Sequence, residues 1–224
     1  MKQNVNSINR VPRNKIVLRG TVAGQPVLSH TAHGIDFYTV PFSVPRKSGI
    51  ADVLNVVVSH PAPELWQVGK WLTLRGEVHS YTQCNGADRR LTVTVRVTAA
   101  YPCAIEAGKN RLVLRGVVST EPSYWCSATG RESCHLMLTV DRLFGPTDYL
   151  PCFVRGDLAN LCGRMEAGTE VILEGMLQCR TFSKTSEEGV EERVVYEMSV
   201  VNLLGMGATL EEQYLQVLEE RKSA

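Results

Sequence analysis

The 224-residue sequence has little excess charge of either sign. Lys and Arg together number 24 and Asp and Glu number 23, so the formal net charge is +1. Nucleic-acid-binding proteins often carry a larger basic excess, because their cations neutralise phosphates. The charge balance therefore argues weakly against that class, unless the charges are sorted by face.

Long hydrophobic runs are also missing. No apolar stretch approaches the roughly 18 residues that a membrane-spanning helix needs, and residues 1–15 lack the apolar centre of a signal peptide. The seven cysteines are an odd number and contain no Cys-x-x-Cys pair. Free thiols in a reducing compartment fit this pattern best, so we expect a cytoplasmic protein.

Motifs for catalysis or for metal binding are absent as well. None of the five histidines lies in a metal-ligand or catalytic pattern, and there is no Gly-rich phosphate loop or Gly-x-Ser-x-Gly. The sequence therefore predicts no enzymatic activity, no cofactor and no metal.

What the sequence does contain is a long internal repeat. "NKIVLRGTV" begins at Asn14, and "NRLVLRGVV" begins 96 positions later at Asn110. This offset holds without a gap over residues 14–58, with identities that include Arg46/Arg142 and Asp52/Asp148. After a three-residue insertion, residues 69–78 match residues 168–177. A repeat of this length is a whole small domain.

The repeat divides the chain into five segments. We expect, in order, a flexible N-terminal arm, a first domain, a linker, a second domain and an amphipathic C-terminal helix, over residues 1–13, 14–101, 102–109, 110–204 and 205–224. Thr209 and Glu212 form a capping box for that last helix. Its apolar stripe would pack on a domain or on a partner chain.

Both repeats show the same order of elements, and the second is clearer. The predicted strands of the second repeat are residues 112–119, 134–140, 149–155, 170–181 and 193–202, with a helix over 156–165. The matching strands of the first are 16–22, 36–44, 53–58, 71–81 and 91–98, with a shorter helix over 61–69. Five strands with a helix between the third and fourth predict an OB-fold, a Greek-key barrel. The fold class is therefore all-β, with two tandem OB-folds and a short C-terminal helix.

The second repeat also resembles a known family. The segments "NRLVLRGVVSTEP", "TDYLPCFVRGDLANL" and "GTEVILEGMLQCRTFSKTSEEG" resemble the bacterial single-stranded DNA-binding proteins. The first repeat matches in its first and fourth strands and poorly in its third. The resemblance implies sequence-independent binding of single-stranded DNA (ssDNA), in assemblies that present four OB-folds. Two features differ from the family pattern: this chain carries two OB-folds, and it ends in "EERKSA" rather than in an acidic recruiting tail.

Candidate residues for base stacking follow from the resemblance and from alternation. Phe182 and Tyr149 fall on aromatic positions of the family. If Tyr149 faces the groove, Phe153 and Arg155 share its face, while Leu150, Cys152 and Val154 face the core. The first repeat has Val53, Val57 and Ser59 at the corresponding positions. The remaining stacking candidates are Tyr81 and Trp125, because aromatic faces accept any base.

The cationic candidates are spread over both repeats. We expect phosphate contacts from Arg46, Lys47, Arg142, Arg155, Arg180, Lys184, Arg89 and Arg90. Arg19 and Arg115 also recur in both repeats, but the resemblance implies that this strand pairs subunits, so they are alternatively interface residues.

Three hypotheses follow. The first is a non-enzymatic protein that protects ssDNA in replication, recombination or repair, as a homodimer with four OB-folds. The second is a primosome-type or protein-interaction module in which one repeat has lost contact with DNA. The third, an OB-fold that binds an oligosaccharide or another ligand, rests on the fold alone.

Overall fold

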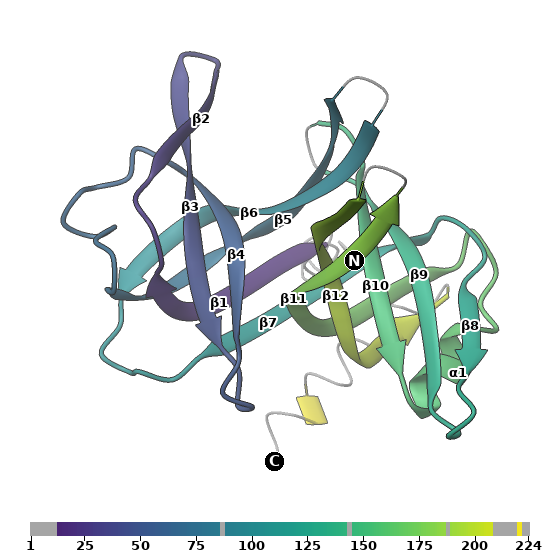
Figure 1. The fold of residues 1–224 in the computed structure, drawn as a ribbon. Helices are drawn as coiled ribbons and strands as arrows, with labels where there is room; N and C mark the ends of the chain where they lie inside the picture. The colour runs from purple at the N-terminus through teal and green to yellow at the C-terminus, as the bar shows by residue number, and fades with distance from the viewer. Residues whose placement is uncertain (1–12, 86–87, 143–144, 187–188, 208–218, 221–224) are drawn as a thin grey trace, which may run out of the picture. The chain divides into compact units, whose positions relative to one another are not determined.

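The computed structural model describes residues 13–85, 88–142, 145–186, 189–207 and 219–220, with no side-chain description for 84–88 and 182–193. Within these ranges the chain forms strands and a single short helix, α1 (Asp157–Cys162). Figure 1 shows the strands, which are β1 (Asn14–Val22), β2 (Val27–Ala32), β3 (Ile35–Pro45), β4 (Ala51–Ser59), β5 (Trp71–Asn85), β6 (Asp88–Pro102), β7 (Lys109–Val118), β8 (Ser123–Cys126), β9 (Glu132–Val140), β10 (Asp148–Arg155), β11 (Glu170–Ser186) and β12 (Gly189–Met206).

The chain divides into two compact units. The first unit consists of Ile16–Leu112 together with Met176–Met198. The second unit consists of Val113–Gly175 with the described residues of Met1–Lys15 and Ser199–Ala224. The middle of the β11–β12 hairpin, although it belongs to the second repeat, is therefore part of the first unit.

A closed barrel forms in the first repeat. β1 pairs with β3 and β5, β3 with β4, and β5 with β6, all antiparallel. A parallel pairing of β4 with β6, at Val56↔Val95 and Val57↔Arg96, closes the ring. In the second repeat β7 pairs with β9 and β11, β11 with β12, β12 with β10, and β10 with β9. Both rings have the five-stranded order of an OB-fold, so this prediction is confirmed.

Alternation along each strand places one set of side chains inside the barrel. On β1, the even-numbered residues from Ile16 to Val22 are buried, and the odd-numbered residues between them are half-buried. On β9, the even-numbered residues from Cys134 to Val140 are buried and the odd-numbered residues lie on the outer face. The two-residue period of a strand with one buried face accounts for this pattern.

Two strands were not predicted. β2 and β8 form at the segment between the first and second expected strands of each repeat, where we expected a turn. β2 pairs with β3 through a two-residue turn, His33-Gly34, in which both φ angles are positive (50° and 73°). Positive φ at both central residues is the requirement of a type I′ hairpin turn. β8 pairs antiparallel with β9, and the five residues 127–131, with Gly130 at a φ of 75°, connect them.

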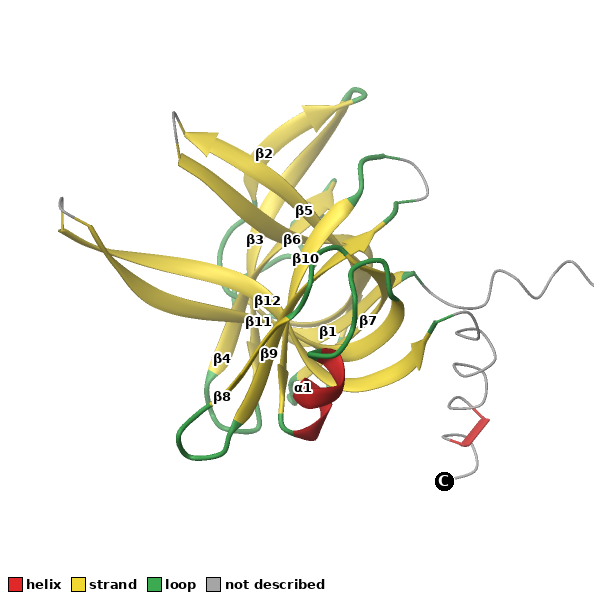
Figure 2. Ribbon diagram, turned by 90° about the vertical axis from the view of Figure 1, so that its right-hand side faces the viewer, coloured by secondary structure: helices red, strands yellow, loops and turns green. Residues whose placement is uncertain are grey.

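The helices differ from the expectation as well. α1 is shorter than the predicted 156–165 and contacts β8, β9 and β10 (Figure 2). The helix predicted over 61–69 does not form; these residues make turns. Pro61 and Pro63 disfavour the α conformation for the residues that precede them, His60 and Ala62, which weakens helix formation there. The C-terminal helix and the N-terminal arm lie outside the described residues, except for Arg13, residues 205–207, Glu219 and Glu220. Among the helices described, none is long and apolar enough to cross a membrane.

Glycines that recur in the repeat lie where two strands approach closely. A Cβ atom on Gly175 would overlap the backbone oxygen of Ser199 on β12, and one on Gly76 would overlap that of Arg96 on β6. These positions exclude any side chain because the obstacle is backbone, which cannot rotate away. The glycines are therefore needed for barrel closure.

The substitution Gly175→Ala tests this requirement. We expect it to destabilise the protein by more than Gly34→Ala, whose added Cβ meets nothing within 4 Å and which carries only the left-handed backbone penalty of roughly 1–2 kcal/mol. Urea unfolding followed by circular dichroism measures both. A smaller loss for Gly175→Ala than for Gly34→Ala would show that the close approach of β11 and β12 does not require a glycine there.

Candidate nucleic-acid interface

The outer face of the second unit is built by β8, β9 and β10. In the β9–β10 pairing, Phe153 stands opposite His135 and Arg155 opposite Ser133. In the β8–β9 pairing, on the other edge of β9, Trp125 stands opposite Ser133. These side chains lie on one face because directly paired residues point the same way. Leu150, Cys152 and Val154 are buried in the barrel, as the alternation predicted.

Three rings and a guanidinium meet on this face. The rings of Trp125 and Phe153 stack with centroids 6.0 Å apart and an interplanar angle of 26°. His135 meets both edge-on, at 4.9 Å from Trp125 and 4.7 Å from Phe153. The Arg155 guanidinium lies 4.5 Å from the Phe153 ring centroid, within cation–π range. We call Trp125, His135, Phe153 and Arg155 the Trp125 cluster.

The Trp125 cluster buries Phe153, which was a candidate for base stacking. Its side chain is only 8% exposed, because Trp125, His135 and Arg155 cover it. Phe153 therefore supports the cluster, whereas Trp125 is 40% exposed and Tyr149, on the same strand as Phe153, is 50% exposed. Trp125 and Tyr149 are thus the two largely exposed aromatic rings described on this face.

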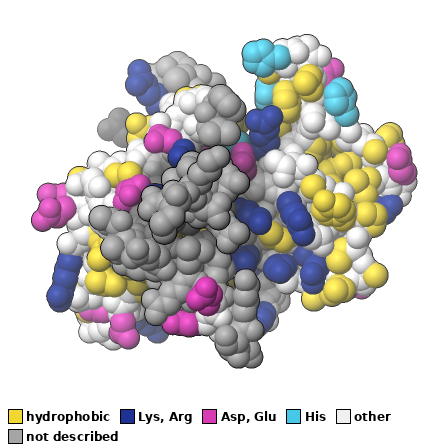
Figure 3. Space-filling view, turned by 180° about the vertical axis from the view of Figure 1, so that it is seen from behind, with side chains coloured by type: hydrophobic (Ala, Val, Ile, Leu, Met, Phe, Trp, Pro, Cys, Tyr) yellow, Lys and Arg dark blue, Asp and Glu magenta, His cyan; other side chains and the backbone are white. Residues whose placement is uncertain are grey.

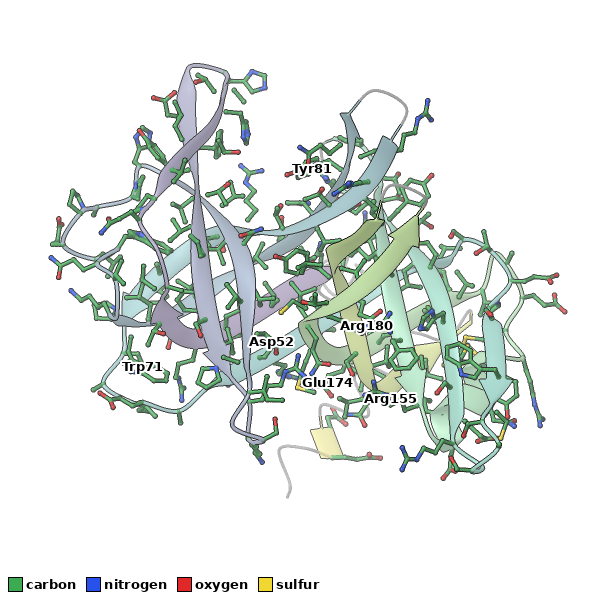
Figure 4. The ribbon with its side chains drawn as sticks, viewed as in Figure 1. Asp52, Trp71, Tyr81, Arg155, Glu174 and Arg180 are labelled. Carbon is green, nitrogen blue, oxygen red and sulfur yellow. The ribbon has the colours of Figure 1, made fainter. Side chains whose placement is uncertain are left out.

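The other candidates lie on the long hairpins and on one loop. Tyr81 is 52% exposed on β5, and Arg89 and Arg90 are exposed on β6. Arg180 on β11 lies 3.6 Å from Glu197, and Lys47 is exposed beyond the end of β3. Figure 4 labels Tyr81, Arg155 and Arg180 on their strands. Phe182 and Lys184 belong to β11, but their side chains lie outside the described part of the chain.

Arg46 and Arg142 have a different arrangement from the one predicted. Arg142 donates two hydrogen bonds to Asp148, from Nε to Oδ2 at 2.8 Å and from Nη2 to Oδ1 at 2.5 Å. Arg46 binds Asp52 in the same bidentate way, and this hydrogen bonding raises the pKa of Arg46. Both carboxylates are buried, so each arginine neutralises a charge inside its own unit. This geometry disfavours the predicted phosphate contacts of Arg46 and Arg142.

The loops between the second and third barrel strands depend on these pairs. Each arginine follows β3 or β9, and each aspartate stands six residues later at the start of the next strand. In the first unit, the backbone N–H of Cys179 also donates to Asp52 at 3.0 Å. The pair therefore connects the loop, β4 and the hairpin residues 176–198.

Sequence reasoning missed His135 as a member of the outer face. Its ring was set aside because it belongs to no metal or catalytic pattern. The available signal was its position: it alternates with buried Cys134 and Leu136, so it must lie on the face opposite the core.

Thiols and metal ligands offer no second site in the described ranges. No group of three or more His, Cys, Asp or Glu side chains there is arranged to hold a metal ion. Burial raises the pKa of the Cys162 thiol to about 12, and it raises the pKa of Cys134 as well. These buried thiols are poor nucleophiles, because the thiolate is the reactive form.

The fold of this chain is similar to that of proteins of known structure. No family model and no curated protein sequence matches the chain. Among solved structures, the wild-type single-stranded DNA-binding protein from Thermus aquaticus superposes with a TM-score of 0.68, over 85% of this chain and 91% of that one, at 17% identity. The chain has the fold of a bacterial single-stranded DNA-binding protein with two OB domains.

Two further solved structures are similar to the chain. A deletion mutant of the Thermus aquaticus protein gives the same TM-score of 0.68 and 17% identity, over 85% of this chain and 92% of that one. The dimeric N-terminal domain of PriB from Thermoanaerobacter tencongensis covers 42% of this chain and 100% of its own, with 26% identity and a TM-score of 0.36. The likeness to the Thermus aquaticus protein is one of fold.

Proposed function

We propose that this chain binds single-stranded DNA without sequence preference and without enzymatic activity, and so protects ssDNA in replication, recombination or repair. The observation that carries the proposal is the Trp125 cluster: an exposed indole is held on a buried phenylalanine, beside an arginine, on the outer face of an OB barrel. Tyr149 stands on the same face.

This arrangement meets the two requirements of sequence-neutral binding. Aromatic faces stack on any base, at roughly 1–3 kcal/mol per base, and cations along the groove attract the phosphates. Because Trp125 is already packed against Phe153 and His135, it has little rotational freedom left to lose on binding. Arg155 adds a positive charge over the Phe153 ring.

A homodimer is part of the proposal. Two chains of this kind would present four OB-folds, the number implied by the resemblance to bacterial single-stranded DNA-binding proteins. Light scattering would then give twice the chain mass of 24.8 kDa. A mass equal to one chain would refute the dimer.

A protein-interaction module is the second candidate, and one observation favours it. In the first unit Val53, Val57 and Ser59 hold the places of Tyr149, Phe153 and Arg155. Between them, Asn55 donates a hydrogen bond to the Tyr196 hydroxyl at 3.3 Å, so part of this strand already has a partner within the chain. A strand face without aromatic rings or cations, and with one polar side chain already bonded within the chain, would suit contact with protein better than contact with DNA.

Titration with oligo-dT at two salt concentrations separates the candidates. We expect binding that quenches tryptophan fluorescence and weakens with salt, because each phosphate contact to a single strand contributes a slope of about −0.7 in log K against log [salt]. Three contacts would weaken binding roughly 20-fold between about 50 and 200 mM salt. Absence of binding at micromolar protein in low salt would reject the DNA-binding proposal and leave the interaction module.

A further inference from the structure

A second ring cluster lies on the first unit, although the first repeat has no aromatic residue at the positions that match Trp125 and Phe153. The ring of His30 on β2 stacks on that of Phe37 on β3, with centroids 4.9 Å apart and an interplanar angle of 11°. The guanidinium of Arg96 on β6 lies 5.9 Å from the Phe37 centroid. His30 and Arg96 are exposed and Phe37 is half-buried. We call these three residues the His30 cluster; Figure 3 shows histidines gathered toward the end of the β2–β3 hairpin.

A β-bulge brings the two rings together. Leu28 pairs with Tyr38, and the next pair is His30 with Phe37, so Ser29 is an extra residue in β2. Without this shift Ser29 would stand opposite Phe37. The Ser29 hydroxyl also lies 3.1 Å from Nδ1 of His30, which orients the imidazole. Bulges that redirect one side chain are common beside functional sites.

The two clusters occupy the same row of their sheets. In the second unit the row runs Trp125, Ser133, Arg155; in the first it runs His30, Phe37, Ser59. Phe37 corresponds to Ser133 in the repeat. The aromatic residue has therefore moved from the third barrel strand to the second, and the two clusters use non-equivalent positions.

The arginine has moved as well. Ser59 replaces Arg155, but Arg96 stands beside Val57 through the parallel pairing of β4 with β6. On the long β5–β6 ribbon the same face continues through the pairs Glu77↔Arg96 and Tyr81↔Thr92. An exposed ring on a less exposed phenylalanine, with a guanidinium over the phenylalanine ring, thus recurs in the first unit.

We propose that the His30 cluster is a nucleotide subsite, in which an unpaired base stacks on the imidazole of His30 while Arg96 holds the adjacent phosphate. The strand would then pass along the outer face of β6 toward Tyr81. This subsite rests on the proposed ssDNA function. In this arrangement DNA would contact the first unit at the Ser59 end of β4. Asn55, four residues away on the same strand, already donates a hydrogen bond to the Tyr196 hydroxyl.

Variants in two backgrounds test the subsite. In the otherwise unchanged protein, His30→Ala and Phe37→Ala should each weaken binding of a roughly 30-nucleotide oligo-dT by about 5-fold or more, the low end of one stacked base. In a Trp125→Ala background, where the second unit is impaired, the same changes should remove most of the remaining affinity. Leu28→Ala is the matched control, because Leu28 is exposed on the same strand but pairs with Tyr38, on the other face.

Arg96 gives an independent measure. Arg96→Gln should reduce the salt slope of the same oligonucleotide by about 0.7, the value of one phosphate contact, and Arg96→Lys should retain the slope. Photocrosslinking to oligo-dT that carries 5-iodouracil should label the peptide that contains His30 and Phe37 in the unchanged protein. Circular dichroism of each variant shows whether the β2–β3 hairpin is intact.

The outcomes separate the subsite from the function it rests on. If the unchanged protein binds no oligo-dT at low salt, the proposed ssDNA function fails. If it binds, and if Trp125→Ala weakens binding while folded His30→Ala and Phe37→Ala variants match Leu28→Ala in both backgrounds, the subsite is wrong and the function stands. Crosslinks confined to peptides of the second unit would overturn the subsite in the same way.

Discussion

Replacing Arg142 with alanine is expected to lower the free energy of unfolding by roughly 3–5 kcal/mol, the range measured when one member of a buried ion pair is removed. Asp148 has no exposed side-chain surface, and Arg142 donates two hydrogen bonds to it. The alanine variant leaves a buried carboxylate without its countercharge. A loss of this size is a large share of the stability of a small domain.

Urea unfolding, followed by Trp125 fluorescence in a Trp66→Phe/Trp71→Phe background, measures this loss in the second unit. Arg131→Ala is the control, because that arginine is exposed at the turn after β8. The double variant Arg142→Met/Asp148→Asn should recover part of the loss, since it removes the charge along with its partner. If Arg142→Ala unfolds like Arg131→Ala, the bidentate pair is not a determinant of stability.

The second large effect concerns DNA. Trp125→Ala and Tyr149→Ala should each weaken oligo-dT binding by about 5- to 150-fold, which corresponds to one stacked base at roughly 1–3 kcal/mol. Both rings are exposed on the outer face of the second unit. Phe153→Leu should weaken binding less than Trp125→Ala, because Phe153 acts by supporting the indole.

Fluorescence anisotropy of a labelled oligonucleotide measures these affinities without relying on tryptophan. Tyr101→Ala is the control, since Tyr101 is about as exposed as Tyr149 but stands at the end of β6, near Arg75. Tyr81→Ala should weaken binding less than Tyr149→Ala. Equal losses of affinity for Tyr81→Ala and Tyr149→Ala would show that both units contribute equally to binding. Unchanged binding by Trp125→Ala would show that the Trp125 cluster is not part of the interface.

The barrels could be predicted from the sequence because their signals are local or repeated. Alternation on residues 149–155 placed Tyr149 outside and Leu150 inside, and the repeat extended the assignment to the first copy. The ion pairs also left a signal: Arg46/Arg142 recur together with Asp52/Asp148 at constant spacing. Because the arginine and the aspartate recur together, these identities favour a structural ion pair over a phosphate contact.

The ring clusters could not be predicted, because they depend on strand register. Trp125 meets Phe153 only because β8 pairs with β9, in a segment where a turn was expected. His30 meets Phe37 only because of a bulge that places an extra residue at Ser29. Neither event has a clear sequence signature, and neither pair preserves the 96-residue correspondence between the repeats.

The β11–β12 hairpin belongs to the second repeat by sequence, but its residues 176–198 pack with the first repeat. This packing limits how the two repeats can be separated. Cys179 and Tyr196 provide hydrogen-bond partners for Asp52 and Asn55, so a chain cut after the first repeat would lose both. The first copy therefore cannot be expressed alone without removing a backbone hydrogen-bond donor from its buried carboxylate, Asp52. The first repeat thus needs part of the second repeat's hairpin to complete its own compact unit.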